Sequence, residues 1–191
     1  MIIFRKQTST PKIYMLRCIE NGIKAINLPD SFIKFYINHQ EEKAVKSLNN
    51  KKLGWLKEED YDNEQEYNKD APISDCPFVY GAIPVFSEKK FKLPTKDCVT
   101  SKFDVSGERY IAVVAPEIEG ILNIRSSKIS KFRDGGIMNV EGYVFNNLPE
   151  YPNLFRLKEY PVFTFCTEDV KKNLELSGFK FLKFIEVKVK L

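Results

Sequence analysis

Histidine and cysteine are the side chains that most often supply acid–base, nucleophilic or metal-binding chemistry, and the chain contains one histidine and four cysteines. His39 lies in the polar stretch 38–42, where a general base and a solvated surface residue both fit its neighbours. Any mechanism that needs two histidines is excluded. The cysteines are widely separated and include no CxxC pair: Cys18, Cys76, Cys98 and Cys166. Because tetrahedral zinc sites need closely spaced ligand pairs, we expect four reduced thiols without a bound metal.

Motifs for nucleotide binding and for serine-based hydrolysis are also missing from the sequence. Gly135, Gly136 and Gly142 match neither GxGxxG nor GxxxxGK[ST]. Five serines lack the GxSxG context of a nucleophile elbow: Ser87, Ser101, Ser106, Ser126 and Ser127. We therefore predict no catalytic residues and no cofactor, which favours a binding protein. The alternatives are a small enzyme of unfamiliar type, with scattered acidic or basic residues, and a regulatory or structural subunit.

The most unusual chemistry-bearing feature is an acidic segment, residues 57–75, which interleaves carboxylates with aromatic side chains. Negative charge can steer a basic partner, and amphipathic rings can then anchor it. The candidate partner-binding residues are Trp55, Glu59, Asp60, Tyr61, Asp62, Glu64 and Tyr67. The alternative is an exposed, solvated loop that only keeps the protein soluble. Calcium binding is not indicated, because the DxDxDG register and its glycine are missing.

Basic residues cluster in a second segment, residues 125–133, which also contains Phe132. This segment could contact phosphate, but a loop or the solvated face of a short helix is the more usual origin of such a run. The whole chain carries 30 basic and 26 acidic residues, a net charge of +4, which is far from the concentrated excess of nucleic-acid-binding proteins. We therefore expect a protein partner rather than a nucleic acid.

The elements that must position these residues fit one domain over residues 1–191, because 43% of the chain is hydrophobic and a single core can grow to this size. In the first half, the alternating segments 13–19 and 23–28 predict a hairpin around Asn21 and Gly22. A helix should follow, capped by Asp30 or Ser31 with Phe32, Ile33, Tyr36 and Ile37 facing inward. Residues 41–50 predict a surface helix, and Ser87 is a candidate cap of another short helix.

Strand patterns dominate the second half. Residues 110–115 predict a central strand, and further strands are expected at 120–124, 137–145, 154–157 and 161–165. A turn is predicted at Asp134-Gly135-Gly136. Thr167 should cap a helix that buries Val170 and Leu174 and ends at Gly178, before a final strand from Phe179. The few helices and the one-sided alternation predict an α+β fold with an antiparallel or mixed sheet.

From residue 84 onward the order of motifs resembles a family of bacterial immunity proteins from polymorphic toxin systems. The resemblance rests on short motifs: Pro84 to Lys89, Tyr110 to Val114, Ile121 to Ile124 with Ser127, Leu154-Phe155-Arg156-Leu157, Thr167 to Lys171, Leu174 and Gly178 to Phe181. Paired CxxC motifs, which some relatives in the wider group carry, are absent. The N-terminal 83 residues carry no such match.

The resemblance implies a cytoplasmic antidote that binds a cognate toxin domain and blocks its action, without catalytic residues of its own. The apolar run within residues 1–12 is shorter than the core of a signal peptide, which also leads us to expect the cytoplasm. No stretch approaches the roughly 20 apolar residues needed to span a bilayer, so no membrane association is expected.

Overall fold

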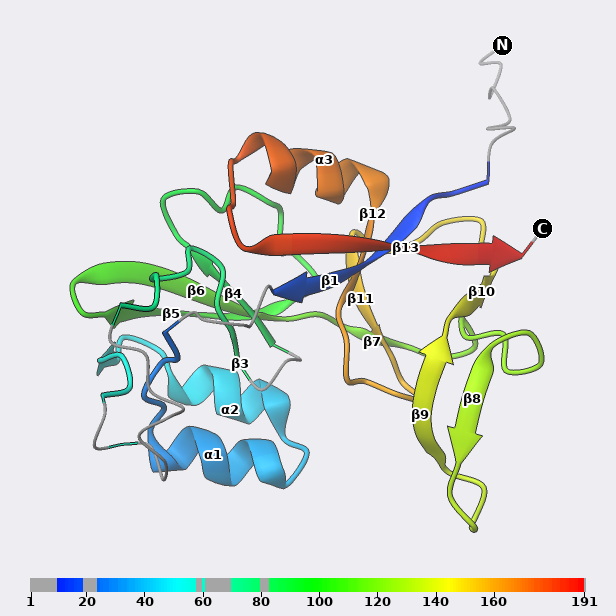
Figure 1. Cartoon of the computed structure of the whole chain (residues 1–191), viewed down its shortest axis with the longest axis horizontal. Coiled ribbons are helices and arrows are strands. Elements are labelled where there is room, and N and C mark those ends of the chain that lie inside the picture. Colours follow the sequence, from blue (N-terminus) through cyan, green and yellow to red (C-terminus); the bar gives the residue numbers. More distant parts are fainter. Residues whose placement is uncertain (1–9, 19–23, 58–59, 61–69, 80–82, 191) are drawn as a thin grey trace.

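The computed structural model describes residues 10–18, 24–57, 60, 70–79 and 83–190. Within these residues the chain forms a five-stranded sheet, a six-stranded sheet and a two-stranded hairpin, with helices packed on the sheets (Figure 1). The six-stranded sheet contains both parallel and antiparallel pairs. The α+β class and the mixed sheet that the sequence predicts are therefore confirmed.

The five-stranded sheet has the order β2-β5-β6-β4-β3. Its strands are β2 (Lys52–Leu53), β3 (Phe78–Val79), β4 (Ile83–Ser87), β5 (Val99–Val105) and β6 (Glu108–Val114). The predicted central strand is confirmed, because β6 lies between β4 and β5 and its last five residues are buried. β-Branched residues fit this position, where both faces of the sheet are covered.

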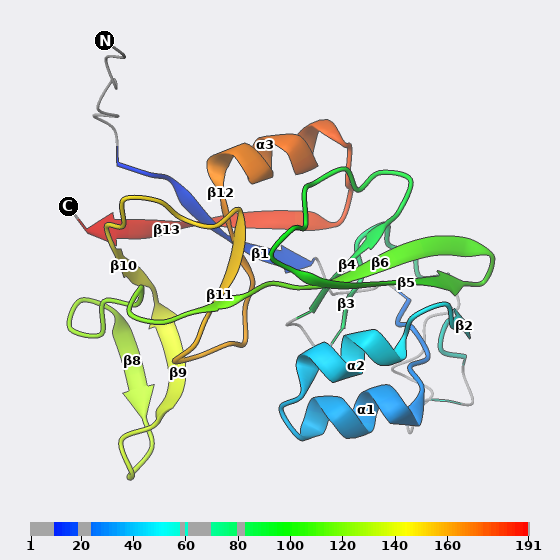
Figure 2. The same ribbon diagram turned by 180° about the vertical axis from the view of Figure 1, so that it is seen from behind.

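Two helices, α1 (Asp30–Ile37) and α2 (Glu41–Ser47), cover one face of this sheet (Figure 2). Phe32 of α1 and Val45 of α2 are fully buried in the core that the helices share with β4, β5 and β6. The predicted inward stripe of α1 is wrong at Ile37, which is 66% exposed. The predicted cap is also wrong: Pro29 precedes the helix, and no side chain caps its N-terminus.

The six-stranded sheet has the order β10-β13-β1-β12-β11-β7. Its strands are β1 (Ile13–Cys18), β7 (Glu117–Ile118), β10 (Val144–Asn146), β11 (Leu154–Leu157), β12 (Phe165–Thr167) and β13 (Leu182–Lys190). The predicted hairpin after β1 is wrong, because β12 and β13 occupy both edges of β1. Ile26 instead forms an isolated bridge with Trp55. Long-range pairing has replaced the predicted pairing of 13–18 with 24–28, and the turn at Asn21 and Gly22 lies outside the described residues.

The third helix, α3 (Glu168–Leu176), packs against the face of the six-stranded sheet that looks toward β4 and β6 (Figure 1). Val170 and Leu174 are buried there, and Gly178 ends the helix with a positive φ of 69°, as predicted. Thr167 precedes the helix, but its side chain makes no capping hydrogen bond. The predicted start of the helix is therefore confirmed, whereas the capping interaction is wrong.

Arg156 joins the two large sheets. Its side chain is buried, and its guanidinium donates to the carbonyl of Ala115, just after β6, and to Glu117 in β7 at 2.9 Å. The same guanidinium donates to the carbonyl of Pro161. One side chain thus ties the end of the five-stranded sheet to the last strand of the six-stranded sheet.

Several local predictions fail where polar turns replace regular elements. Residues 88–90 form a turn after β4, not a helix, and the Ser87 carbonyl accepts hydrogen bonds from the amides of Lys90 and Phe91. In the predicted strand 120–124 only Leu122 forms a bridge, to Phe145. Residues 161–164 precede β12 instead of forming a strand.

The end of the acidic segment is a loop that is only partly exposed. Ser74 is fully buried, its carbonyl accepts a hydrogen bond from the Tyr110 hydroxyl, and Ala71 is 8% exposed. Asp75 forms an ion pair with Lys90 and accepts a hydrogen bond from the amide of Lys180. Ala71, Ser74 and Asp75 thus anchor this part of the loop to the body, whereas Pro72 and Ile73 are exposed.

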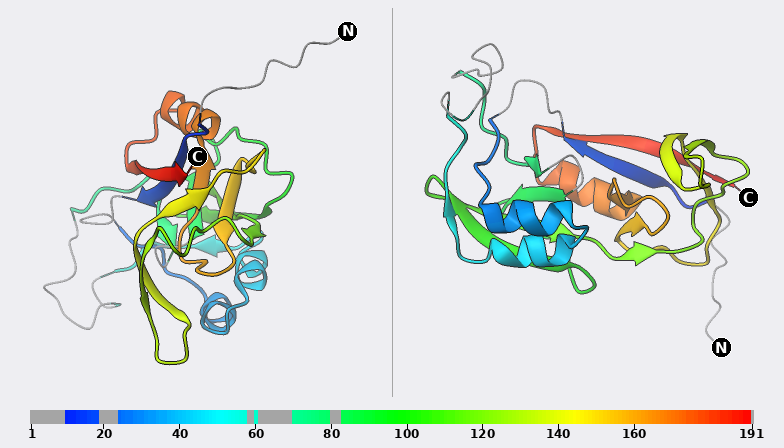
Figure 3. Two further views of the ribbon diagram at one scale, coloured as in Figure 1. Left: turned by 90° about the vertical axis from the view of Figure 1, so that its right-hand side faces the viewer. Right: turned by 90° about the horizontal axis from the view of Figure 1, so that it is seen from below.

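The predicted turn at 134–136 closes a hairpin of β8 (Lys128–Lys131) and β9 (Ile137–Gly142). The basic segment 125–133 therefore contains a strand, and the predicted loop or helix face is wrong there. The predicted strand 137–145 divides at Tyr143 into β9 and β10. Figures 1 and 3 show the hairpin projecting from the body of the molecule, away from α1, α2 and the five-stranded sheet. We call β8, β9 and their turn the arm.

Candidate functional site

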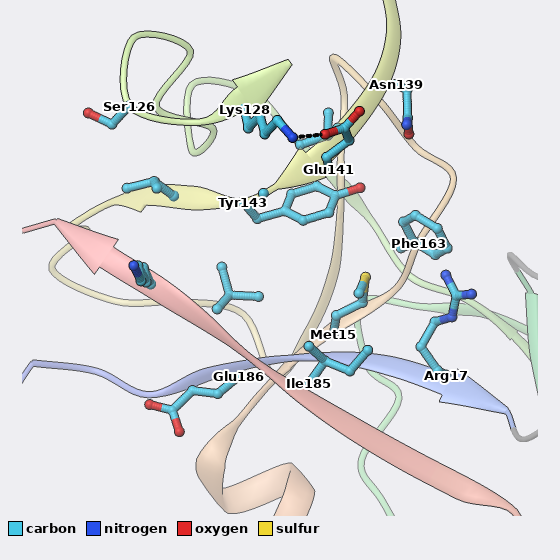
Figure 4. A pocket seen from close by; sticks show the side chains of 15 residues that line it. Met15, Arg17, Ser126, Lys128, Asn139, Glu141, Tyr143, Phe163, Ile185 and Glu186 are labelled. Carbon is cyan, nitrogen blue, oxygen red and sulfur yellow. Dashed lines mark ion pairs between the residues drawn. The ribbon is translucent and has the colours of Figure 1, made fainter. Parts of the chain in front are cut away.

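A cleft of about 570 Å³ opens at the base of the arm, between the arm and the six-stranded sheet. Three elements that are distant in sequence meet there: β1, the arm with Tyr143, and β13 (Figure 4). We call this space the arm cleft. Its shape comes from the break at Tyr143, which lets β9 leave the sheet while β10 stays paired with the end of β13.

Phe163 forms the centre of the cleft wall and contacts two polar side chains. The Arg17 guanidinium lies 4.6 Å from the centre of the Phe163 ring, a cation–π arrangement. The Tyr143 ring meets Phe163 edge-on, with 6.3 Å between ring centres. Arg17 and Tyr143 thus flank one aromatic ring, as Figure 4 shows.

The Tyr143 hydroxyl is buried and has no hydrogen-bond partner among the described residues. Burial raises the pKa of this phenol, and the charge of nearby Arg17 acts in the opposite direction. A buried hydroxyl without a partner costs about 1–3 kcal/mol. The cleft therefore contains a neutral donor that a bound group could satisfy.

The cleft is lined by three cations, Arg17, Lys128 and Lys188, and by two carboxylates, Glu141 and Glu186. Lys128 of β8 forms an ion pair with Glu141 of β9, which holds the two strands together at the base of the arm. Arg17 and Lys188 form no ion pair within the described part of the chain. A carboxylate from outside the chain could therefore be attracted to this cleft.

The arm itself exposes large apolar side chains. Phe132 near the turn and Met138 on β9 are 56% and 48% exposed, and Ile124, just before the arm, is 48% exposed. Val140 is the one side chain of the two strands that the structure classes as buried, so the body covers little of the arm. Apolar residues on a projecting element do not stabilise the fold and are typical of binding surfaces.

Of the partner-binding residues that the sequence predicts, the structure describes Trp55 and Asp60, and neither lines the arm cleft. Trp55 is half-buried against the core under α1 and α2, with its ring edge-on to Tyr110 at 6.0 Å between centres. Asp60 is exposed and accepts a hydrogen bond from the amide of Lys57 at 2.7 Å. The other five residues lie outside the described ranges: Glu59, Tyr61, Asp62, Glu64 and Tyr67. The role of this segment in binding stays a prediction.

The remaining chemistry-bearing residues are set in structural surroundings. Cys18, Cys76 and Cys166 are buried and Cys98 is half-buried, and no disulfide joins any of these four described thiols. Burial raises the pKa of the Cys98 thiol to about 11 and also raises those of Cys76 and Cys166. His39 is exposed at the junction of α1 and α2, with a positive φ of 54°.

No three histidine, cysteine or carboxylate side chains among the described residues are grouped as metal ligands. Comparison with protein-family models gives no match, and comparison with curated proteins gives none either. Within the described ranges, no helix has the length and apolar character needed to cross a membrane.

Proposed function

We propose that this protein is a binding protein of the immunity type, which neutralises a cognate toxin domain in the cytoplasm by occupying its surface. The proposal combines the resemblance of residues 84–191 to immunity proteins with the arm and the arm cleft as the binding surface. Neutralisation by binding needs a stable scaffold and a complementary surface, and it needs no catalytic group.

The observation that carries the proposal is the arm, a projecting hairpin that exposes Phe132 and Met138. Exposed aromatic and methionine side chains are enriched at protein interfaces, and most of the binding energy usually comes from a few such residues. A projecting hairpin can also enter a concave site, as an inhibitor of an enzyme must. The body of the protein then excludes substrate from the entrance of that site.

A complex with the toxin domain encoded next to this gene tests the proposal. Phe132→Ser and Met138→Ser together remove the apolar side chains of the arm without changing charge. If the arm anchors the partner, the affinity measured by titration calorimetry should fall by about 10²-fold or more, because each lost anchor costs more than about 1 kcal/mol. Protection of cells that co-express the toxin should be lost in parallel.

Leu176 of α3 offers a matched control, since it is 87% exposed and lies on the opposite side of the six-stranded sheet. Leu176→Ser removes an exposed apolar side chain of similar size and should leave affinity and protection unchanged. The absence of any complex with the neighbouring toxin domain would contradict the proposed function. Equal losses for the arm and α3 variants would contradict the arm as the contact surface.

A further inference from the structure

β13 has one paired edge and one edge that is largely open. β1 pairs with Leu182 to Val187 on one side, but β10 pairs only with Lys188, Val189 and Lys190 on the other. No other described strand pairs with β13. The other edge strands of the two large sheets, β2, β3, β7 and β10, are two or three residues long. Short edges discourage pairing with foreign strands, so the six-residue open stretch of β13 is the exception.

The direction of the free backbone groups follows from a neighbouring hydrogen bond. The amide of Leu16 donates to the carbonyl of Thr164, so even-numbered residues of β1 direct their amides and carbonyls toward β12. Odd-numbered residues of β1 must then face β13, where they pair with Lys183, Ile185 and Val187. The amides and carbonyls of Leu182, Phe184 and Glu186 are therefore directed at the open edge.

This edge borders the arm cleft, and the side chains on its two faces differ. Lys183 and Ile185 pair with Arg17 and Met15 of β1, so the four side chains lie on the same face of the sheet. Three of them, Arg17, Met15 and Ile185, line the cleft. Ile185 is 39% exposed. The opposite face carries Glu186, which would repel an anion. A strand added here would place alternate side chains next to Lys183 on the cleft face, with Arg17 one strand further away.

A second copy of this chain would not pair its opposite charges at this edge. When a twofold axis perpendicular to the sheet relates two copies, odd-numbered residues of one copy lie opposite odd-numbered residues of the other, and even-numbered residues lie opposite even-numbered ones. Lys183 of one copy therefore cannot oppose Glu186 of the other. The pairing would leave Lys183 beside another cation or an apolar residue. The charge pattern instead fits a different chain with carboxylates on one face.

We propose that the open edge of β13 binds an extended segment of a protein partner by strand addition, with acidic side chains on the face that lies over the arm cleft. Main-chain hydrogen bonds to Leu182, Phe184 and Glu186 would hold the segment. Its carboxylates would be placed beside Lys183, on the face of the sheet that also carries Arg17 on the next strand. The inference rests on the proposed function, because it assigns this segment to the same partner.

A model peptide tests the edge without the toxin. The probe is a blocked octapeptide of alternating threonine and glutamate, in which a strand conformation places all glutamates on one face. Binding is followed by residue-resolved NMR. A peptide with lysine in place of every glutamate is the charge control, and we expect binding of the acidic peptide only.

Two further peptides carry N-methyl groups on either the threonines or the glutamates. In a strand, alternate residues direct their amides to one neighbour, so one methylation pattern removes every N–H donor that faces β13 and places methyl groups between the strands, and the other pattern leaves those donors intact. We expect one N-methylated peptide to lose binding and the other to keep it. Equal binding by both peptides would overturn strand addition.

Amide hydrogen exchange gives an independent readout on the protein. In the free protein, the amides of Leu182, Phe184 and Glu186 should exchange faster than those of Lys183, Ile185 and Val187, which β1 protects. At a free peptide concentration of ten times Kd, exchange at the first three should slow by about tenfold. Protection of these three amides in the free protein, for example in a dimer, would overturn the inference.

Lys183→Glu should weaken binding of the acidic peptide at least about tenfold, because Lys183 borders the open edge. Lys43→Glu on α2 is the control: Lys43 is also exposed but does not border the edge, so this change should leave binding unaffected. If no acidic peptide binds while the toxin domain still requires the arm, the strand-addition inference fails and the proposed function stands. If the peptide binds but no toxin domain does, the proposed function is wrong, and so is the assignment of the segment to a toxin partner.

Discussion

β6 and β9 are both strands of antiparallel ladders, but their surroundings differ. β6 is the central strand of a sheet and buries its last five residues, whereas β9 buries only Val140 and pairs only with β8. Stability therefore comes from the body, and the arm contributes little of it. A region with few buried contacts can change its surface residues at little cost to the fold, which suits a surface that must match one particular partner.

The largest effect that tests this comparison is expected in the body. Phe103 of β5 is 1% exposed and lies next to Tyr110 of β6, with 6.4 Å between ring centres. Phe103→Ala should lower the free energy of unfolding by about 3–5 kcal/mol, because it removes buried apolar surface and leaves a cavity. Urea denaturation followed by fluorescence measures the change. A loss below about 1 kcal/mol would show that this core is not tightly packed.

Helix α3 sharpens the comparison within a single element. Leu174 is 1% exposed, and Leu176, two residues later, is 87% exposed. Leu174→Ala should cost about 2–4 kcal/mol, whereas Leu176→Ala should change stability by less than about 0.5 kcal/mol. The same urea titration compares the two variants. Similar effects at the two positions would contradict the burial of the Leu174 face.

In the arm the same type of experiment should give small effects. Val140→Ala should cost about 1–2 kcal/mol, because the 5%-exposed valine, together with the half-buried Ile129 and Ile137, joins the arm to the core of the body. Phe132→Ala at the exposed end should fall within about 0.5 kcal/mol of the wild type. Thermal unfolding by circular dichroism can follow both variants. A loss above about 2 kcal/mol for Phe132→Ala would mean that the arm packs on something that supports the fold.

The smallest effect is expected for a surface ion pair of the body. A hydrogen bond from Lys102, with the charge of Arg109, lowers the pKa of Glu88 from its ordinary value of 4.5. Because the folded-state pKa is the lower one, the stabilisation is present above pH 4.5 and is lost as the pH falls through the folded-state value. Exposure and solvent screening limit it to less than about 1 kcal/mol.

Glu88→Gln tests this contribution by urea denaturation at several pH values. The variant should be slightly less stable than the wild type at pH 7, and the difference should shrink below pH 4.5. A difference that does not depend on pH would assign the effect to packing or to the neutral hydrogen bond instead of the charge.

The sequence predicts elements whose signals are local and whose surroundings are ordinary. The apolar, β-branched run 110–115 is a central strand, and the acidic first turn, inward Val170 and Leu174, and terminal Gly178 mark α3. β8 is not predicted from the sequence, because none of its residues is buried and its sequence therefore shows no alternation of apolar and polar residues. The hairpin expected after β1 is wrong because strands from the other end of the chain compete successfully for both edges of β1.

The arm cleft could not be predicted for a related reason. Arg17, Tyr143, Phe163 and Lys183 come from four separate segments, and only the sheet order and the break after β9 bring them together. None of them has a motif around it. The acidic segment, by contrast, is conspicuous in composition, and of its described residues only Ala71 and Ser74 are buried in the body.

The central position of β1 also constrains how the chain can fold during synthesis. Ile13 of β1 pairs with Val187 of β13, so this pairing cannot form until β13 has been synthesised. At about 5–20 residues per second, the ribosome needs roughly 10–35 s to make the intervening chain. The helices α1 and α2 and the strands of the five-stranded sheet are complete well before that. During this interval the apolar β1 has neither of its neighbours, which makes the nascent chain a natural client for a chaperone that holds short apolar segments.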